Sequence, residues 1–169
     1  MRSCKVVITG AFNTGKSAFI RAASDITVVS TEKRITDHLS EVKETTTVAM
    51  DYGQTNVGGW LFHLYGTPGQ PRFDFMWDIL ARDVDALLVL VDSTDRSTLT
   101  LARQLLRRLA RRRTPYLVVA TKQDGHRPMT PKEIAQALGV TAQRVVACDP
   151  RQRASTHAVL AHLSQLLES

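Results

Sequence analysis

The chain has 169 residues, of which 43% are hydrophobic and 22% charged, a composition typical of one soluble globular domain and unlike that of a disordered or fibrous chain. It contains no run near the roughly 20 apolar residues that span a bilayer, and its first residues lack the apolar stretch of a signal peptide. Arg2 does not fit an N-myristoyl signal, and the last four residues contain no cysteine for prenylation. We therefore expect a single cytoplasmic domain over residues 1–169, without a lipid anchor and with Cys4 and Cys148 as free thiols.

The formal net charge of +6 raises the question of an anionic partner. Six arginines lie between Arg103 and Arg113, both included, and leucine and alanine recur there at helical spacing. This pattern predicts an amphipathic surface helix with a basic outer face. A solvated face, a contact with an acidic protein and a peripheral contact with an anionic membrane are all compatible with it. We predict no specific nucleic-acid site.

Short apolar runs alternate with helical patterns along the chain, which is typical of βαβ units around a mostly parallel sheet. Strands are predicted at 5–9, 46–52, 60–65, 86–92, 116–121 and around 144–147. Helices are predicted at 17–23, from Pro131 onward and at the C-terminal end. Residues 24–45 are polar and without a sustained period, so we expect a long surface connection there, with at most a short strand at 26–29.

Residues 53–59 are rich in glycine and polar side chains, which predicts a hairpin between the strands at 46–52 and 60–65. That hairpin gives an otherwise parallel sheet its antiparallel edge. The prediction is an α/β protein of three layers: a six-stranded, mostly parallel sheet with one antiparallel edge strand, and helices on both faces.

The strongest chemical signal is the segment 10–17, which reads G-A-F-N-T-G-K-S and matches G-x-x-x-x-G-K-[ST] between a predicted strand and a predicted helix. Glycines allow backbone N–H groups to turn inward at a helix N-terminus, where the dipole also favours phosphate. Lys16 is then placed to neutralise the β- and γ-phosphates, and the Ser17 hydroxyl to ligate Mg²⁺. The predicted phosphate-binding residues are Gly10, Asn13, Thr14, Gly15, Lys16 and Ser17.

A phosphate-binding loop does not choose between ATP and GTP, so the residues that contact the base decide the class. Thr121, Lys122 and Asp124 follow directly on the predicted strand at 116–121. They resemble the N/T-K-x-D guanine motif of Ras-superfamily GTPases, which implies that Asp124 accepts from guanine while Lys122 lies along the base. A carboxylate accepts two hydrogen bonds from guanine, whereas adenine offers no such pair of adjacent donors.

The resemblance extends over essentially the whole chain and implies the three-layer P-loop fold of small G proteins. Residues 45–52 look like the first switch, in which Thr47, with Thr46 as the alternative, joins Ser17 on the metal. Residues 64–73 look like the second switch, with Gly69 contacting the γ-phosphate and Gln70 orienting the attacking water. Cys148 stands in the place of the family's S-A-K loop, so its backbone N–H is expected at the guanine oxygen.

The combination of T-T-V-A-M-D-Y-G with G-T-P-G-Q and a downstream F-M-W is similar to bacterial Ras-like GTPases of the conservon type and, more distantly, of the gliding-motility Mgl type. Such a resemblance implies a protein partner of the roadblock (LC7) class. Phe73 and Trp77, beside the second switch, are our candidates for a partner surface.

The chain departs from the family pattern at two positions. Gly66 stands where Ras-like proteins carry the aspartate of D-x-x-G, so a carboxylate near Mg²⁺ is missing, and Asp51 or Asp92 could replace it through water. Phe12 stands where Ras has a glycine near the catalytic glutamine, and its bulk is expected to slow hydrolysis. Arg72 fits a partner contact better than a catalytic group, so no internal arginine finger is predicted.

These patterns predict a molecular switch that binds GTP or GDP with Mg²⁺ and slowly hydrolyses GTP, with Lys16 and Gln70 as the catalytic residues. The first alternative is a GTP-binding scaffold without useful hydrolysis, which Gly66 and Phe12 favour. An ATP-dependent P-loop kinase and a nucleic-acid-binding module resting on the arginine-rich helix follow as weaker alternatives.

Overall fold

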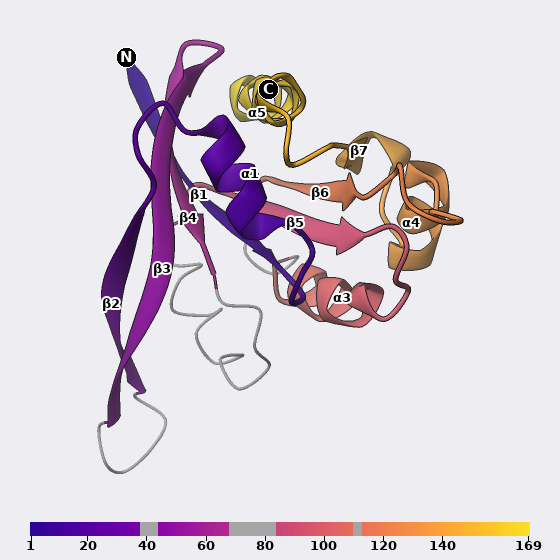
Figure 1. Ribbon diagram of the computed structural model, residues 1–169, viewed down its shortest axis with the longest axis horizontal. Helices are drawn as coiled ribbons and strands as arrows, with labels where there is room; N and C mark the ends of the chain where they lie inside the picture. The colour runs from indigo at the N-terminus through magenta and orange to yellow at the C-terminus, as the bar shows by residue number, and fades with distance from the viewer. Residues whose placement is uncertain (38–43, 68–83, 110–112) are drawn as a thin grey trace.

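The fold is a computed structural model that describes residues 1–37, 44–67, 84–109 and 113–169, with the backbone alone at 30–37, 44–49 and 109. Within these residues a seven-stranded sheet runs in the order β2-β3-β4-β1-β5-β6-β7. Figure 1 shows β1, β5, β6 and β7 between two layers of helices, with β2 and β3 at the left side of the molecule. The strands are β1 (Arg2–Gly10), β2 (Val29–Asp37), β3 (Glu44–Val57), β4 (Trp60–Gly66), β5 (Ala86–Asp92), β6 (Tyr116–Thr121) and β7 (Val145–Ala147).

The sheet is mostly parallel. Strands β4, β1, β5, β6 and β7 all run the same way, and β3 is antiparallel both to β4 and to β2. The carboxyl ends of the parallel strands therefore meet at one edge, which is where open α/β sheets place ligand-binding loops. The predicted three-layer fold with a mostly parallel sheet and helices on both faces is confirmed.

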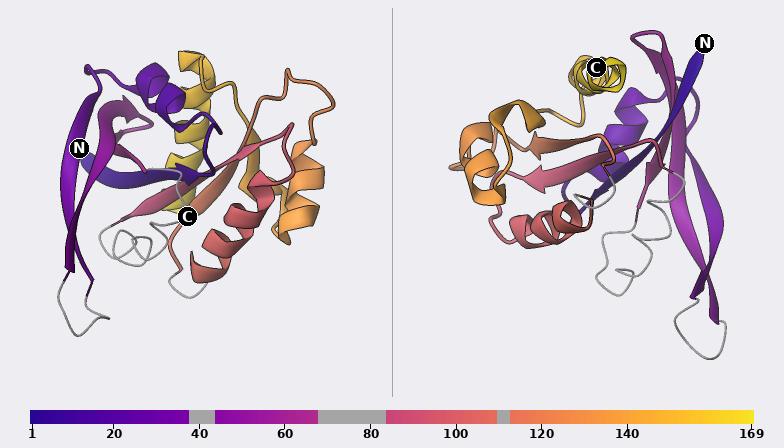
Figure 2. Two further views of the ribbon diagram at one scale, coloured as in Figure 1. Left: turned by 60° about the horizontal axis from the view of Figure 1, so that its bottom comes forward. Right: turned by 180° about the vertical axis from the view of Figure 1, so that it is seen from behind.

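Helices cover the two faces of the sheet in pairs (Figure 2). On one face lie α1 (Lys16–Ala23) and α5 (Arg153–Glu168), and on the other lie α3 (Thr98–Leu109) and α4 (Pro131–Leu138), with the short η3 (Ala142–Arg144) after α4. The start of α4 is fixed locally, because the Thr130 side chain accepts the Glu133 N–H at 3.1 Å and Pro131 occupies the first helical turn. Gly139, at φ 71°, ends this helix.

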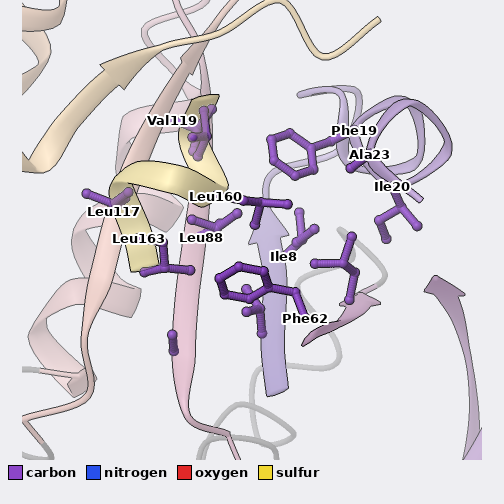
Figure 3. Close-up of a cluster of buried hydrophobic side chains, with 14 of the residues drawn as sticks. Ile8, Phe19, Ile20, Ala23, Phe62, Leu88, Leu117, Val119, Leu160 and Leu163 are labelled. Atoms are coloured by element: carbon purple, nitrogen blue, oxygen red, sulfur yellow. The ribbon is translucent and has the colours of Figure 1, made fainter. Parts of the chain in front are cut away.

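The core lies on both faces of the central strands, which explains their continuous apolar runs. Along β5, Leu88 and Leu90 pack toward α1 and α5, whereas Leu87 and Val89 pack toward α3 and α4. Figure 3 shows the first of these clusters, where side chains of α1 and α5 meet those of β1, β4, β5 and β6. No helix in the described part of the chain is both long and apolar enough to cross a bilayer.

The sheet has one strand more than predicted. Residues 29–37, assigned to a surface connection, form β2 and pair residue by residue with β3 from Val29 opposite Tyr52 to Asp37 opposite Glu44. The antiparallel strand β3 therefore lies inside the edge. The prediction failed here because β2 gains its order from backbone pairing with one neighbour, which does not require an alternating apolar pattern.

The connection between β3 and β4 is also tighter than predicted. Strand β3 continues to Val57, so the turn consists of Gly58 and Gly59 alone, at φ 60° and 80°. Two consecutive residues with positive φ form the kind of two-residue turn that matches the twist of a hairpin. The ladder through Val57 and Trp60 thus begins directly at the turn and sets the register of the whole β3–β4 pair.

The predicted amphipathic helix is confirmed as α3. Leu99, Ala102, Leu105 and Leu106 are buried against the sheet, while Arg103 and Arg107 are exposed. The helix ends at Leu109, and the arginines at 111 and 112 lie outside the described residues.

Candidate functional site

The phosphate-binding loop joins β1 to α1 at the carboxyl edge of the sheet. Gly10 has φ 145°, and a Cβ on it would lie 2.5 Å from the Leu90 carbonyl oxygen. Gly15 has φ 107°, and a Cβ on it would lie 2.9 Å from Pro150 Cγ. Both positions therefore require glycine for conformation and for space. The result is a loop whose backbone approaches its neighbours closely and leads straight into a helix N-terminus.

Lys16 lies folded across this loop. Its Nζ donates to the carbonyl oxygens of Gly10 and Ala11, both at 2.8 Å. Burial lowers the pKa of the ammonium to about 8. The ammonium is thus partly buried inside the loop, with two carbonyl oxygens as hydrogen-bond partners and, among the residues that the structure describes, no carboxylate beside them. Binding of an anion in the loop is therefore favoured, because it would supply the counter-charge.

A buried threonine connects the phosphate-binding loop to the next segment. The single hydroxyl proton of Thr121, at the end of β6, faces the Thr14 carbonyl oxygen at 2.7 Å and the Val91 carbonyl oxygen at 3.1 Å. Thr121 is fully buried, as is Thr14. The contact joins residues 107 positions apart in the chain, so the loop after β1 and the loop after β6 are held at a defined separation.

Lys122 strengthens the same connection. Its backbone has a φ of 59°, and its side chain extends toward the phosphate-binding loop. There Nζ donates to the Asn13 carbonyl oxygen and to Asp92 Oδ2, both at 2.9 Å. Burial raises the pKa of Asp92, but the hydrogen bonds from Thr94 and Lys122 outweigh it and leave the pKa below its usual value. The Asp92 carboxylate is therefore charged and committed to holding Lys122 and Thr94.

Asp124 stands two residues further on, with most of its side chain exposed. Arg151, from the loop after β7, donates to Asp124 Oδ2 at 2.9 Å and holds Asp149 through Nε at 3.0 Å. Hydrogen bonds to Asp149 and then to Asp124 raise the pKa of Arg151. The carboxylate predicted to recognise guanine is thus accessible and is oriented by a neighbouring loop. Its partner Arg151 is a long, exposed side chain, so a ligand can displace this ion pair at little cost.

The backbone N–H of Cys148 has a partner in the protein. It donates to the Ala120 carbonyl oxygen at 3.0 Å, which continues the pairing of β6 with β7. A guanine oxygen would have to share or displace this bond, so the geometry gives the predicted contact no support. The neighbouring Asp149 N–H donates to Ser155 Oγ at 2.8 Å.

On the opposite side of the phosphate-binding loop, Ser17 meets a carboxylate. Its hydroxyl donates to Asp51 Oδ2 at 2.9 Å. Ser17 is the first-turn residue of α1 and Asp51 lies on β3, so the bond links the loop to the antiparallel strand.

These oxygens fit a magnesium ion better than a softer metal. Mg²⁺ binds in small sets of one or two protein oxygens together with phosphate oxygens and water, rather than in an all-protein cage. The described residues contain no group of three or more histidine, cysteine or acidic side chains that could hold a metal. A hydroxyl beside one carboxylate, next to a phosphate-binding loop, is a donor set that fits a nucleotide-bound Mg²⁺.

The structure therefore brings together two of the predicted motifs. Residues 10–17 and residues 121–124 lie side by side, as the bonds of Thr121 and Lys122 to the first loop demonstrate. Thr47 is opposite Arg34 in the β2–β3 ladder, and its side chain is outside the described part. Thr47 lies four residues before Asp51, or about 13 Å away along an extended strand. Gly69, Gln70, Arg72, Phe73 and Trp77 lie outside the described residues.

Sequence reasoning missed Arg151 and Asp149. The signal available was a reversal of charge: an acidic residue, Asp149, stands where the S-A-K loop has lysine, and a basic residue follows two positions later. Phe12 of the phosphate-binding loop, which the sequence singles out as a departure from the family pattern, is 80% exposed.

Comparison with known proteins places the chain in a family. Residues 26–168 match the model of a family described as conserved hypothetical ATP binding protein. The human ADP-ribosylation factor-like protein 5A is 30% identical over 142 residues, which cover 82% of this chain and 72% of that protein. The chain belongs to this ATP-binding-protein family and to the family of Arf-like small GTPases. Protein MJ1339 of Methanocaldococcus jannaschii is 26% identical over 121 residues, covering 71% of this chain and 70% of its own length.

Solved structures show that small GTPases share this fold. The Arl6 BBS3 small GTPase of Trypanosoma brucei, solved with the nucleotide analogue GppNp, has a TM-score of 0.74 at 19% identity and 98% coverage of both chains. The G domain of the T. maritima FeoB iron transporter has a TM-score of 0.68 at 16% identity, covering 99% of this chain and all of its own. These likenesses show that the chain has the fold of small GTPases.

Replacing Thr121 by valine removes the hydroxyl that joins the two loops and keeps the shape of the side chain. The Thr14 carbonyl oxygen loses its hydroxyl donor inside the protein, so we expect the free energy of unfolding to fall by about 1–3 kcal/mol. Urea denaturation of the nucleotide-free protein measures it.

Thr9→Val is the matched control. Thr9 is fully buried as well, and its Oγ1 has no hydrogen-bond partner among the described residues. Its replacement is expected to leave stability unchanged or raise it slightly. An equal loss in both variants would show that the Thr121 hydroxyl does not hold the loops together.

Proposed function

We propose that the protein is a guanine-nucleotide switch that binds GTP and GDP with Mg²⁺ and slowly hydrolyses GTP to GDP and phosphate. The observation that carries the proposal is the pair of bonds from Lys122, to Asn13 of the phosphate-binding loop and to Asp92 at the end of β5. These bonds hold the loop that carries Asp124 against the loop that carries Lys16. A molecule with a polyphosphate at one end and a purine at the other matches that arrangement.

The choice of guanine rests on Asp124. Its carboxylate is an acceptor with two oxygens and lies exposed at the loop after β6. It matches the paired N–H donors on one edge of guanine, whereas the corresponding edge of adenine presents no adjacent donor pair. The description of the matching family names ATP, so an ATP-binding protein is the second candidate, and identification of the bound nucleotide separates the two.

Each remaining residue has a defined task in this proposal. Lys16 leaves the Gly10 and Ala11 carbonyl oxygens and neutralises the phosphates, while Gly15 exposes the N–H groups at the start of α1. Ser17 and Thr47 provide oxygens for the metal, which when bound neutralises charge on the phosphates. Gly69 contacts the γ-phosphate and Gln70 orients water for in-line attack.

Switching follows from the position of Thr47. With β2 and β3 paired as they are, Thr47 lies about 13 Å along the strand from Asp51, so its participation requires the β2–β3 pair to rearrange. A nucleotide that binds one arrangement more tightly shifts the population toward it and changes the surface offered to partners. On the sequence resemblance we propose a roadblock-type partner, with Phe73 and Trp77 at the contact, and a bacterial conservon-like origin. The basic face of α3 is available to an acidic protein or to an anionic membrane.

Hydrolysis is proposed to be slow because of two residues. Gly66 brings no carboxylate to the metal, and Phe12 places a bulky ring on the phosphate-binding loop. Fast turnover then requires a partner protein, for example one that supplies an arginine to stabilise the transition state. The competing function is a GTP-binding scaffold that does not hydrolyse its nucleotide.

Native mass spectrometry of the purified protein tests the nucleotide assignment. We expect a mass increment of GDP or GTP together with one magnesium ion, released by EDTA. ATP or ADP in its place would support the second candidate, and a protein that carries no nucleotide and takes up none from solution would contradict the proposal.

Asp124→Ala removes the guanine-reading carboxylate. Loss of two hydrogen bonds to a charged group, at roughly 1.5 kcal/mol or more each, predicts at least a roughly 100-fold weaker affinity for GDP. The weak affinity for ADP should stay as it is in the wild type, because adenine does not use this carboxylate. Calorimetric titration with both nucleotides gives the comparison, and an unchanged preference for GDP over ADP would exclude Asp124 as the selecting residue.

Single-turnover hydrolysis of bound GTP tests the rate. We expect a rate constant at or below the range of unassisted Ras-type enzymes, about 10⁻⁴ to 10⁻³ per second. A much faster reaction would contradict the effect assigned to Gly66 and Phe12. Nucleotide that remains intact for many hours, with and without cell extract, would favour the scaffold.

A further inference from the structure

The position of Gly66 raises the question of which group replaces the missing carboxylate. Gly66 ends β4, and it pairs with Ile8 of β1 two residues before the phosphate-binding loop begins. A side chain at this point would project toward α1, because a Cβ on Gly66 would lie 2.6 Å from Ile20 Cδ1. Ile20 is fully buried, so the core of this chain fills the place where a side chain on residue 66 would begin.

Asp51 lies directly across from that place. In the antiparallel ladder it is the partner of Gly66, and a Cβ on Gly66 would be 3.5 Å from Asp51 Cβ. Residues directly opposite in an antiparallel pair project from the same face of the sheet. The Asp51 carboxylate therefore starts from the neighbouring strand and faces the same side as a residue-66 side chain would.

The direction of the Asp51 side chain is fixed by its contact. Its Oδ2 accepts from the Ser17 hydroxyl at 2.9 Å, and Ser17 is the residue of the phosphate-binding loop that is placed for the metal. Asp51 is only half buried and lines a hollow of about 500 Å³ together with Arg21 and residues 26–29. Water has access to the carboxylate, which therefore stays available to a hydrated cation.

Asp92, the other carboxylate near the loop, is already in use. It accepts from Lys122 Nζ at 2.9 Å and from the Thr94 N–H and hydroxyl at 2.9 and 2.6 Å. Withdrawing it would leave the Lys122 ammonium without its counter-charge. Of the two candidate carboxylates, only Asp51 is directed at the hydroxyl predicted to bind the metal.

We infer that Asp51 is the metal-side carboxylate of this chain, supplied across the β3–β4 ladder in place of the aspartate that residue 66 lacks. The inference rests on the proposed function, because it assigns a residue to the magnesium of the bound nucleotide. Its chemistry is that of a hard anionic oxygen beside Ser17, which strengthens the hold on Mg²⁺ directly or through a bound water.

The test measures the release of a fluorescent mant-GDP from the intact protein as the concentration of MgCl₂ is varied. In the wild type, Mg²⁺ should slow release with a defined midpoint, and EDTA should restore fast release. Asp51→Asn keeps the size of the side chain and its hydrogen bond from Ser17, but removes the charge. We expect its magnesium midpoint to rise about 10- to 100-fold, while the release rate in EDTA stays within twofold of the wild type.

Two further variants make the outcome specific. Glu168→Gln removes a carboxylate that pairs with Arg2 at the far end of β1, and it should leave the midpoint unchanged. Asp92→Asn should weaken nucleotide binding in Mg²⁺ and in EDTA alike, since it loosens Lys122. Direct titration of the GDP complex with Mn²⁺, followed by electron paramagnetic resonance, should show the same loss of metal affinity in Asp51→Asn.

Each result has a distinct meaning. An unchanged magnesium midpoint in Asp51→Asn, or a midpoint that shifts in Asp92→Asn instead, overturns the inference and leaves the proposed function standing. Release accelerated equally with and without Mg²⁺ assigns Asp51 a structural role and also overturns it. A wild-type protein that binds no mant-GDP overturns the proposed function itself, and the assignment of Asp51 falls with it.

Discussion

The whole site depends on the contact between the loop after β6 and the loop after β1. Lys122 donates to the Asn13 carbonyl oxygen and Thr121 donates to the Thr14 carbonyl oxygen. Two adjacent side chains of the second loop therefore hold two adjacent backbone carbonyl groups of the first. The first of these contacts requires unusual backbone at both of its ends, since Asn13 and Lys122 each have positive φ. This strain is tolerated because a buried hydroxyl bond and a charge-assisted bond oppose it. The distance between the phosphate-binding loop and Asp124 is thereby set before any ligand binds.

At two places in the site, a charge that the family pattern puts on one residue is carried by a different residue nearby. The carboxylate missing at Gly66 has a counterpart at Asp51 on the adjacent strand, where a pair of residues directly opposite share one face. At the other end of the site, Asp149 stands where a lysine is expected, and Arg151 brings the positive charge back beside Asp124. In the first case the replacing charge lies on the neighbouring strand, whereas in the second it lies two residues further along the chain.

That difference explains what could be predicted from the sequence. The strands of the core, the phosphate-binding loop and the base motif were predicted because each is encoded within a few consecutive residues. Strand β2 was missed because its order comes from backbone pairing with β3, which leaves no periodic trace. The choice between Asp51 and Asp92 was undecidable for the same reason, since it depends on register and on what Lys122 already occupies. Arg151 belongs to a loop whose neighbours only the fold brings near.

The spacing of two residues on β3 connects the metal to the switch. Asp51 and Thr47 are four positions apart, so they share a face of the strand, yet they lie about 13 Å apart along it. One metal ion, with ligand distances near 2 Å, cannot take oxygens from both while β3 stays extended and paired with β2. In the proposed switch, a state that uses Asp51 alone and a state that also recruits Thr47 would therefore differ in the β2–β3 ladder. The free energy that separates these states is set by that ladder, which at residues 44–50 of β3 is paired with β2 and not with β4. Among the described residues this part of β3 is paired on one side, and such a pairing is weaker than one held on both sides. We therefore propose the β2–β3 pair as the element that a bound γ-phosphate rearranges.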